Sequence, residues 1–229
     1  LRIQANNIDS ESSSWMVWDK TGNVYYFGET VTGSANRASY QAWDSCEDGI
    51  PVNQRSVAWQ WSLNRVVNPF GKQLTYRYWS ETKVISSICD ESYVSPSTLA
   101  TYPLDITYAN GRYRIQFIFA QNRTDWDHDW YYGVSSQNIF QRSRLGEIQV
   151  QHDADGDGAF NDDLLIRKYV LSYASTSGFI FPNYTWSQGD KTLTLLQIQE
   201  YGLNGAGPLP ATTFSYDGMH LTSAANGYG

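Results

Sequence analysis

Short runs that alternate apolar and polar residues, separated by glycine-containing turns, constrain this chain more than any other feature of its sequence. In residues 57–63, 73–79 and 113–119 the character of the side chains changes with a period of two, as it does between the two faces of a β-strand. The last run follows Asn110-Gly111, and both residue types tolerate the positive φ of a tight hairpin turn. The pattern therefore predicts antiparallel hairpins rather than helices.

Runs of the same kind recur at hairpin spacing, at residues 23–27, 146–151, 166–173, 192–201 and 213–216. The sequence contains 17 Tyr and 9 Trp, which suit strands because the ring packs on the pleated surface while the polar tip stays hydrated. We therefore expect an all-β fold of antiparallel hairpins, arranged as a sandwich, a barrel or a curled sheet.

The composition of the two ends suggests where the domain begins and ends. Residues 1–14 are polar and are expected to form an irregular lead-in, whereas residues 217–229 are rich in Gly, Ser, Ala and Asn and are expected to form a tail or linker. Residues 15–216 contain no convincing linker, so we expect them to form a single β domain. The chain has no Met at position 1 and no signal peptide, so we expect it to be a piece of a longer polypeptide.

Charge and hydrophobicity exclude several classes of partner. The net charge of −7 argues against nucleic-acid binding, because phosphates require a basic surface. No stretch approaches the roughly 18 apolar residues that a membrane-spanning helix needs. Cys46 and Cys89 could form a disulfide or could be two unrelated thiols, since the sequence alone does not place their Cα atoms within bridging distance.

Short motifs rich in Trp, Tyr, Gly and Arg follow one another in a fixed order between residues 15 and 216. They are residues 15–28 (WMVWDKTGNVYYFG), 61–71 (WSLNRVVNPFG), 102–108 (YPLDITY), 117–125 (FIFAQNRTD), 144–148 (RLGEI), 167–173 (RKYVLSY), 195–202 (LLQIQEYG) and 209–216 (LPATTFSY). In this order they resemble the motifs of the N-terminal β region of SpvB-like proteins, of the B components of insecticidal toxin complexes and of related Rhs/YD-repeat proteins.

The resemblance implies a structural role rather than a catalytic one. In that family such strands form part of a large β-rich shell that wraps or carries a toxin cargo, or form an extracellular adhesive scaffold, and the catalytic cargo is a separate C-terminal domain. It therefore implies a curled Rhs-like sheet in a secreted or cell-surface bacterial protein, with other domains of the same large polypeptide as partners. The Glu-x-Glu pair of an SpvB-type ADP-ribosyltransferase occurs nowhere in the sequence.

An acidic, glycine-rich segment predicts a calcium-binding loop. Residues 153–158 reproduce the D-x-D-x-D-G start of a calcium loop, in which carboxylates at alternate positions converge on one hard cation. Leu164 stands where an EF-hand carries its bidentate Glu, so Asp162 or Asp163 must complete the shell. The alternative is a solvated acidic turn without a metal. The predicted calcium ligands are Asp153, Asp155, Asp157, Ala159, Asp162 and Asp163.

A second cluster, at residues 123–133, combines carboxylates with aromatic rings. Trp126, Trp130 and Tyr131 could stack on a sugar, which gives carbohydrate binding as the alternative function, and the carboxylates could also imitate a glycosidase pair. The resemblance gives Arg123 and Asp125 a structural reading instead. No nucleophile elbow, metalloprotease motif or Walker loop is present, so we expect no catalytic activity.

Overall fold

The computed structural model describes residues 1–8, 12–86, 94–120, 141–160, 164–174, 193–217 and 220–226. These residues form strands and one short 3-10 turn, η1 (Leu203–Gly205), and twelve of the strands belong to an open antiparallel sheet. The all-β prediction is confirmed, and the open sheet excludes a closed barrel for the described strands. No helix in the described part of the chain has the length and apolarity needed to cross a membrane.

Contacts divide the chain into two compact units, which we describe separately. The first is Leu1–Asn110, and the second contains Tyr113–Ala120 and Gln141–Gly229. The strands of the first unit are β1 (Arg2–Asn6), β2 (Ser14–Trp18), β3 (Val24–Phe27), β4 (Arg37–Ala42), β5 (Ser45–Glu47), β6 (Ile50–Val52), β7 (Arg55–Trp61), β8 (Leu63–Val67), β9 (Gln73–Ser86) and β10 (Val94–Tyr108). The strands of the second are β11 (Tyr113–Ala120), β12 (Arg144–His152), β13 (Leu164–Tyr173), β14 (Leu195–Tyr201), β15 (Thr212–Asp217) and β16 (His220–Asn226).

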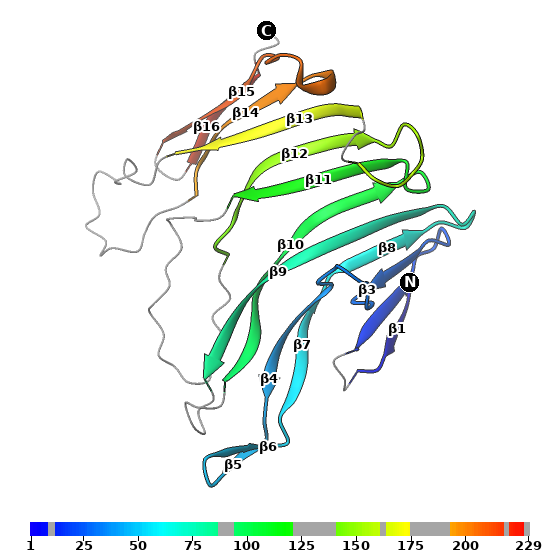
Figure 1. Cartoon of the computed structure of the whole chain (residues 1–229), viewed down its shortest axis with the longest axis vertical. Helices are drawn as coiled ribbons and strands as arrows, with labels where there is room; N and C mark the ends of the chain where they lie inside the picture. The colour runs from blue at the N-terminus through cyan, green and yellow to red at the C-terminus, as the bar shows by residue number, and fades with distance from the viewer. Residues whose placement is uncertain are drawn as a thin grey trace. The chain divides into compact units, whose positions relative to one another are not determined.

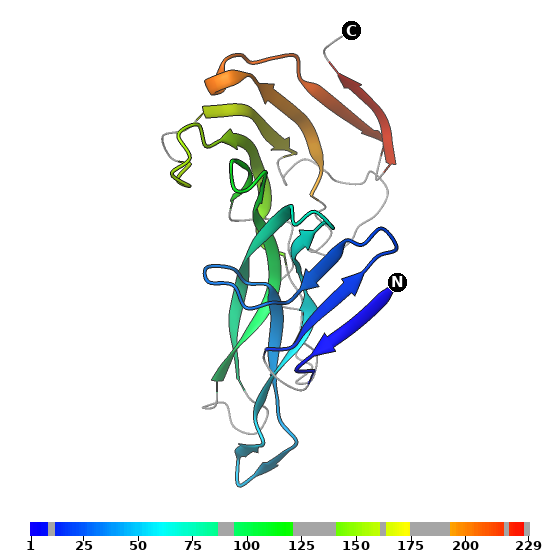
Figure 2. The same ribbon diagram turned by 90° about the vertical axis from the view of Figure 1, so that its right-hand side faces the viewer.

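In the first unit a long hairpin carries a smaller ribbon. The sheet order is β1-β2-β3-β8-β9-β10, and β9 and β10 pair from Val94↔Ser86 to Thr107↔Thr75. The ribbon of β4 and β7 runs beside this hairpin and ends in the small β5–β6 hairpin (Figures 1 and 2). Side chains fix the ribbon to β10, since the Oγ1 of Thr101 accepts a 2.9 Å hydrogen bond from Gln60.

Each strand of the second unit pairs with the next strand in the sequence. The order is β11-β12-β13-β14-β15-β16, and the observed pairs are all antiparallel. The Asn110-Gly111 turn before β11 is confirmed, since both residues have positive φ, 60° and 87°. Successive turns lie at opposite ends of the strands. Every second turn therefore lies at the same end of the sheet.

Both ends of the chain are more regular than expected. Residues Arg2–Asn6 form β1, which pairs with β2 over five residues, and His220–Asn226 form β16, which pairs with β15. The expected lead-in at 1–14 and tail at 217–229 therefore contain strands, and the single domain expected at 15–216 stays a prediction. The lead-in conceals an alternation of Arg2, Gln4 and Asn6 with Ile3 and Ala5, which its polar character obscured.

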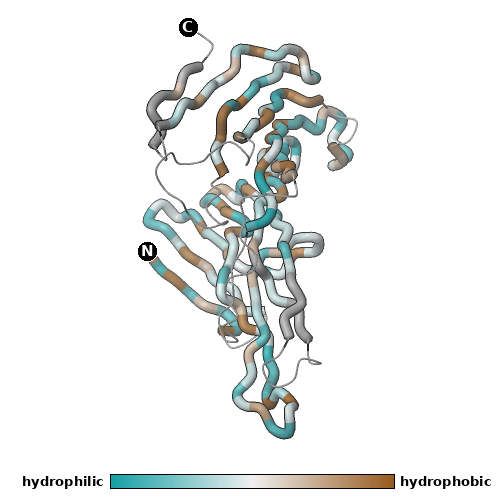
Figure 3. Tube along the Cα trace, turned by 90° about the vertical axis from the view of Figure 1, so that its left-hand side faces the viewer, coloured by the Kyte–Doolittle hydropathy of each residue, from teal (hydrophilic) through white to brown (hydrophobic). Residues whose placement is uncertain are grey.

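Polar side chains dominate the most buried positions of the described residues. The buried apolar residues among them are Ala38, Ala100, Tyr102 and Phe160, whereas the two largest side chains below 2% exposure are Asn64 and Asp105. Hydrophilic and hydrophobic residues interleave along the strands (Figure 3), and most strand side chains are half-buried. The sheet is therefore held by hydrogen bonds as much as by apolar packing.

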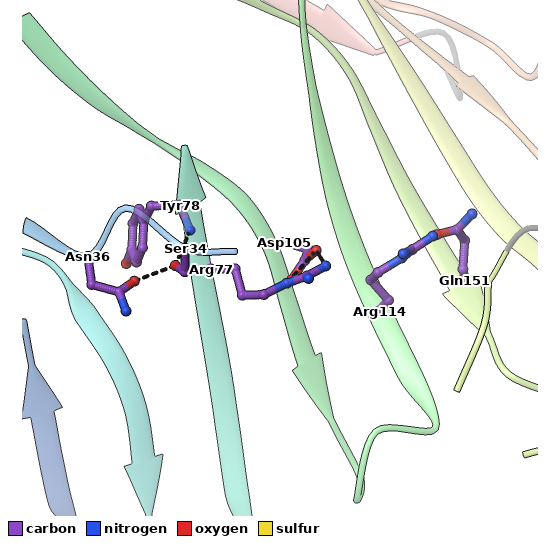
Figure 4. A network of polar contacts seen from close by, with 7 residues as sticks. All are labelled: Ser34, Asn36, Arg77, Tyr78, Asp105, Arg114 and Gln151. Atoms are coloured by element: carbon purple, nitrogen blue, oxygen red, sulfur yellow. Dashed lines mark hydrogen bonds and ion pairs between the residues drawn. The ribbon is translucent and has the colours of Figure 1, made fainter. Parts of the chain in front are cut away.

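Two polar contacts tie β9 to its surroundings (Figure 4). Arg77 on β9 makes a bidentate ion pair with Asp105 on β10, with 2.8 Å between Nε and Oδ1. The next residue, Tyr78, donates its backbone N–H to the hydroxyl of Ser34 at 2.8 Å, and that hydroxyl is hydrogen-bonded to Asn36. The loop between β3 and β4 is thus fastened to β9 through its own side chains.

The β3–β4 loop also depends on Asn64 and on a glycine. The side-chain oxygen of Asn64 accepts the backbone N–H of Glu29 at 2.8 Å, and its amide group donates to the carbonyl of Glu29 at 3.3 Å. Gly28 has φ +69°, and a Cβ there would lie 2.4 Å from Cδ1 of Trp61. Only glycine fits this close approach without displacing the indole.

The Arg77–Asp105 ion pair should contribute far more stability than an exposed pair. Asp105 is 1% exposed, so Arg77→Met leaves a buried carboxylate without its partner and should lower the free energy of unfolding by about 3 kcal/mol. The matched control is Arg55→Met, which breaks a pair with Asp44 in which both side chains are about half exposed and should cost far less, because water screens the pair. Urea unfolding of both variants measures the difference, and equal losses would contradict it.

Candidate functional site

The predicted calcium loop lies at the turn between β12 and β13. β12 ends at His152 and β13 begins at Leu164. The Asp153 loop (residues 153–160, as far as the structure describes it) therefore lies at the end of these two strands. The backbone N–H of Asp153 donates to the carbonyl of Arg112 at 2.9 Å. Arg112 follows the β10–β11 turn. This hydrogen bond therefore joins that turn to the β12–β13 turn at the same end of the strands.

The loop is folded around the carboxylate of Asp153. One oxygen accepts the backbone N–H of Gly156, and the other accepts the backbone N–H of Gly158 at 3.2 Å. Both glycines have positive φ, +87° and +81°, which lets the chain reverse sharply and aim these donors inward. The two glycines therefore let the loop turn around the Asp153 carboxylate.

The carboxylates of Asp155 and Asp157 each accept an N–H two residues further on. The distances are 3.1 Å from the nitrogen of Asp157 to Asp155 and 2.7 Å from the nitrogen of Ala159 to Asp157. One oxygen from each of Asp153, Asp155 and Asp157 lies within 4.8 Å of the others. Three of the predicted ligands are thus brought together, with Asp153 buried and the other two exposed.

The electrostatics of the loop favour an ionised Asp153. Burial raises the pKa of its carboxyl group, but the N–H groups of Gly156 and Gly158 and the positive charge of Arg112 outweigh that effect, so the pKa lies below its ordinary value. The acid is therefore held in the charged form that a cation requires.

Arg112 also shapes the loop directly. Its guanidinium donates to the carbonyl of Ala154 at 3.0 Å. A Cβ on Gly156 would lie only 2.4 Å from Nη1 of Arg112, so the absence of a side chain at position 156 makes room for the guanidinium. One cationic side chain is thus built into the loop beside three grouped carboxylates.

The far end of the described loop is anchored on the sheet by Phe160. The ring of Phe160 is 9% exposed and lies 4.3 Å from the guanidinium carbon of Arg114. Arg114 on β11 donates to the side-chain oxygen of Gln151 at 2.8 Å (Figure 4). Gln151 donates in turn to the carbonyl of Phe160. The loop is therefore fixed to the sheet at both ends.

Several predicted site residues are not joined to this cluster. The N–H of Ala159 is bonded to Asp157, and the ligand role predicted for Ala159 stays a prediction. Asp162 and Asp163 lie outside the described residues, as do Trp126, Trp130 and Tyr131, so the predictions of a completed metal shell and of sugar stacking stay predictions. Cys46 in β5 takes part in a disulfide, whereas Cys89 lies outside the described residues.

Sequence reasoning missed three residues that build the site: Arg112, Gln151 and Phe160. The position of Arg112 could have been inferred, because a meander of consecutive strands brings the β10–β11 and β12–β13 turns to the same end of the strands. Nothing in the sequence signals the packing of Phe160 under Arg114, which depends on strand register.

Comparison with known proteins identifies the fold. No protein-family model matches the sequence, and no curated protein matches it. The crystal structure of TcdB2-TccC3 without the hypervariable C-terminal region matches with a TM-score of 0.58 and 15% identity, over 94% of this chain and 11% of that chain. The chain has the fold of this segment of TcdB2-TccC3.

Two other solved structures extend the comparison. The Tc holotoxin pore of Photorhabdus luminescens matches with a TM-score of 0.50 and 12% identity, again over 94% of this chain and 11% of that chain. The N-terminal domain of effector protein SpvB from Salmonella typhimurium strain LT2 gives a TM-score of 0.49 and 14% identity over 88% of this chain and 65% of that one. The resemblance to toxin-complex B components is confirmed at the level of the fold.

The lowered pKa of Asp153 predicts a dependence of stability on pH. Because the folded-state pKa is below the ordinary 3.8, the contribution of the carboxylate is complete above that value and is lost as the pH falls through the lower folded-state pKa. The free energy of unfolding should therefore fall more steeply with acid in the native chain than in Asp153→Asn, whose amide cannot accept both N–H groups. Urea unfolding from pH 6 to pH 2 measures this, with Asp48→Asn at an exposed turn as the control, and identical slopes for the native chain and Asp153→Asn would refute it.

Proposed function

We propose that this chain is a non-catalytic structural module of a larger, secreted or cell-surface toxin-like polypeptide. The observation that carries the proposal is the coverage of the structural match, which includes 94% of this chain but only 11% of TcdB2-TccC3. A segment with this fold is one stretch of a much longer chain in the proteins that it resembles, and other domains of the same polypeptide are its partners.

The burial of the described residues supports a module that other parts of a polypeptide cover. A self-contained domain buries an apolar core between layers, whereas here the most buried large side chains are Asn64 and Asp105. Large apolar side chains stay exposed, among them Ile3 at 59% and Leu203 at 54%. Strands of this kind gain stability when neighbouring segments cover them.

The Asp153 loop is proposed as a calcium site that stiffens the turn between β12 and β13. Oxygen donors without His or Cys favour a hard cation, and three carboxylates within 4.8 Å repel one another unless a cation lies between them. Arg112 supplies a single positive charge and donates to the carbonyl of Ala154. A calcium ion would balance the remaining charge and hold the turn.

A structure of the intact polypeptide that contains this chain tests the proposed module. Electron cryo-microscopy should show the strands of this chain continuing into neighbouring strands or covered by other segments. A chain that appears as a separate domain, tethered by linkers and contacting nothing else, would be the opposite result. Turnover of any substrate by the isolated chain would refute the non-catalytic role.

Calcium should raise the thermal stability of the isolated chain. A ligand that binds only the folded state at 100 times its dissociation constant adds about 2.7 kcal/mol, so the melting midpoint should rise with calcium and fall back with chelator. Asp157→Ala should abolish the shift, because it removes one of the three carboxylates and puts no other oxygen in its place, whereas Asp48→Ala removes the same charge elsewhere and should leave the shift intact. A midpoint that does not respond to calcium would exclude the site.

A further inference from the structure

The β5–β6 hairpin carries one of the two cysteines of the sequence. Cys46 in β5 is exposed and takes part in a disulfide, and the sequence contains only one other cysteine, Cys89. A bond within the chain therefore has a single possible partner. In the sequence, Cys89 falls between the end of β9 at Ser86 and the start of β10 at Val94. The bond would link the small hairpin to the connection between the two longest strands.

The β5–β6 hairpin is a small, exposed element in the described part of the chain. It forms a two-stranded sheet of its own with three residue pairs. At its base the carboxylate of Asp44 accepts hydrogen bonds from Asn53 at 3.1 Å and from Arg55 at 2.6 Å, which are local contacts. All three residues of β5 are exposed, and Ile50 in β6 is 50% exposed. An isolated two-stranded hairpin is only marginally stable in water, so a covalent bond can decide whether this one stays ordered.

The ribbon of β4 and β7, which carries the hairpin at its end (Figure 1), is held by contacts of a different kind. The backbone N–H of Ser39 in β4 donates to the hydroxyl of Thr98 at 3.3 Å, and Gln60 in β7 donates to the hydroxyl of Thr101 at 2.9 Å. Ala38 in β4 is fully buried, at 0% exposure. None of these contacts involves a sulfur atom. Opening of the disulfide should therefore release the hairpin and leave the ribbon on β10.

The exposure of Cys46 makes the bond accessible to thiols. In thiol–disulfide exchange, a thiolate of a dithiol attacks one sulfur of the bond, and the second thiol of the same reagent then resolves the mixed disulfide. Two electrons and two protons pass to the chain, which gains two thiols, while the reductant becomes a disulfide. The reverse reaction with a disulfide oxidant closes the bond in an oxidising compartment.

We propose that Cys46 and Cys89 form an intrachain disulfide that holds the β5–β6 hairpin and is opened by dithiol reductants. The bond closes a loop that contains β7, β8 and β9, and a cross-link of this kind stabilises a fold mainly by restricting the unfolded chain. The inference rests on the secreted or cell-surface location in the proposed function, because only an oxidising compartment keeps the bond closed. Transfer to a reducing compartment would free the hairpin while the sheet persists.

Peptide mapping of the intact polypeptide, recovered from outside the cell, tests the pairing. Arg55, Lys72 and Lys83 lie between the two cysteines, so trypsin separates them unless a disulfide joins their peptides. After free thiols are alkylated without reductant, mass spectrometry should find the Cys46 and Cys89 peptides as one linked species. Dithiothreitol should divide this species into two peptides, each of which gains one hydrogen.

Hydrogen exchange of the intact polypeptide tests whether the bond holds the hairpin. Dithiothreitol should speed the exchange of the amides of residues 45–52 by about tenfold or more, because the released hairpin opens locally, and should leave residues 98–107 of β10 unchanged. Cys46→Ser with Cys89→Ser should show the fast exchange without reductant and no response to it. The control Ser45→Ala changes an exposed neighbour and should behave as the native chain does.

The pairing and the role of the bond can each be overturned. Alkylation of both cysteines without reductant, or a disulfide between two copies of the chain, would overturn the pairing. Unchanged exchange of residues 45–52 after reduction would overturn the role of the bond, and so would a loss of protection throughout β10. The proposed module fails separately, since a chain that contacts no other segment of the polypeptide can still contain the disulfide.

Discussion

The antiparallel hydrogen-bond ladder is the interaction on which the rest of this structure depends. With few apolar side chains buried among the described residues, correct register cannot rely on a hydrophobic core alone. Buried polar groups also specify the register, because a buried polar group without a hydrogen-bond partner costs free energy. Asp105 finds Arg77 across one strand pair, and Asn64 binds both backbone groups of Glu29. A shift of one residue would leave these groups without partners.

The alternation of side chains was sufficient to predict the all-β class and the approximate positions of β3, β11, β12, β13 and β15. It missed β1, where Arg2, Gln4 and Asn6 alternate with only two apolar residues, and it failed where one run contains two strands. The run at 57–63 is interrupted at Ser62. β7, before it, pairs with β4 in a separate two-stranded sheet, whereas β8, after it, belongs to the twelve-stranded sheet. That change depends on the buried contact of Ser62 with Asn36, which no local pattern encodes.

Some residues of the candidate site can be predicted from nearby sequence, and others depend on strands that are distant in the sequence. The spacing of Asp153, Asp155 and Asp157 is a local property from which the loop was predicted, and the positive φ of Gly156 and Gly158 is local as well. Arg112 enters from a different hairpin, and Gln151 and Phe160 meet through strand register. Side chains that support a site from a distance follow from topology rather than from motif spacing.

The pairing of β3 with β8 has a consequence for how the first unit assembles. Most of the observed pairs join consecutive strands, so the sheet can grow one hairpin at a time with little loss of chain entropy. β3 is different, because β4 to β7 separate it from β8 in the sequence. As the chain emerges during synthesis, β1, β2 and β3 must wait for residues 63–67 before the sheet can continue. Closure of this one long loop is therefore the expected slow step, and the polar fastening of residues 28–36 can form only after it.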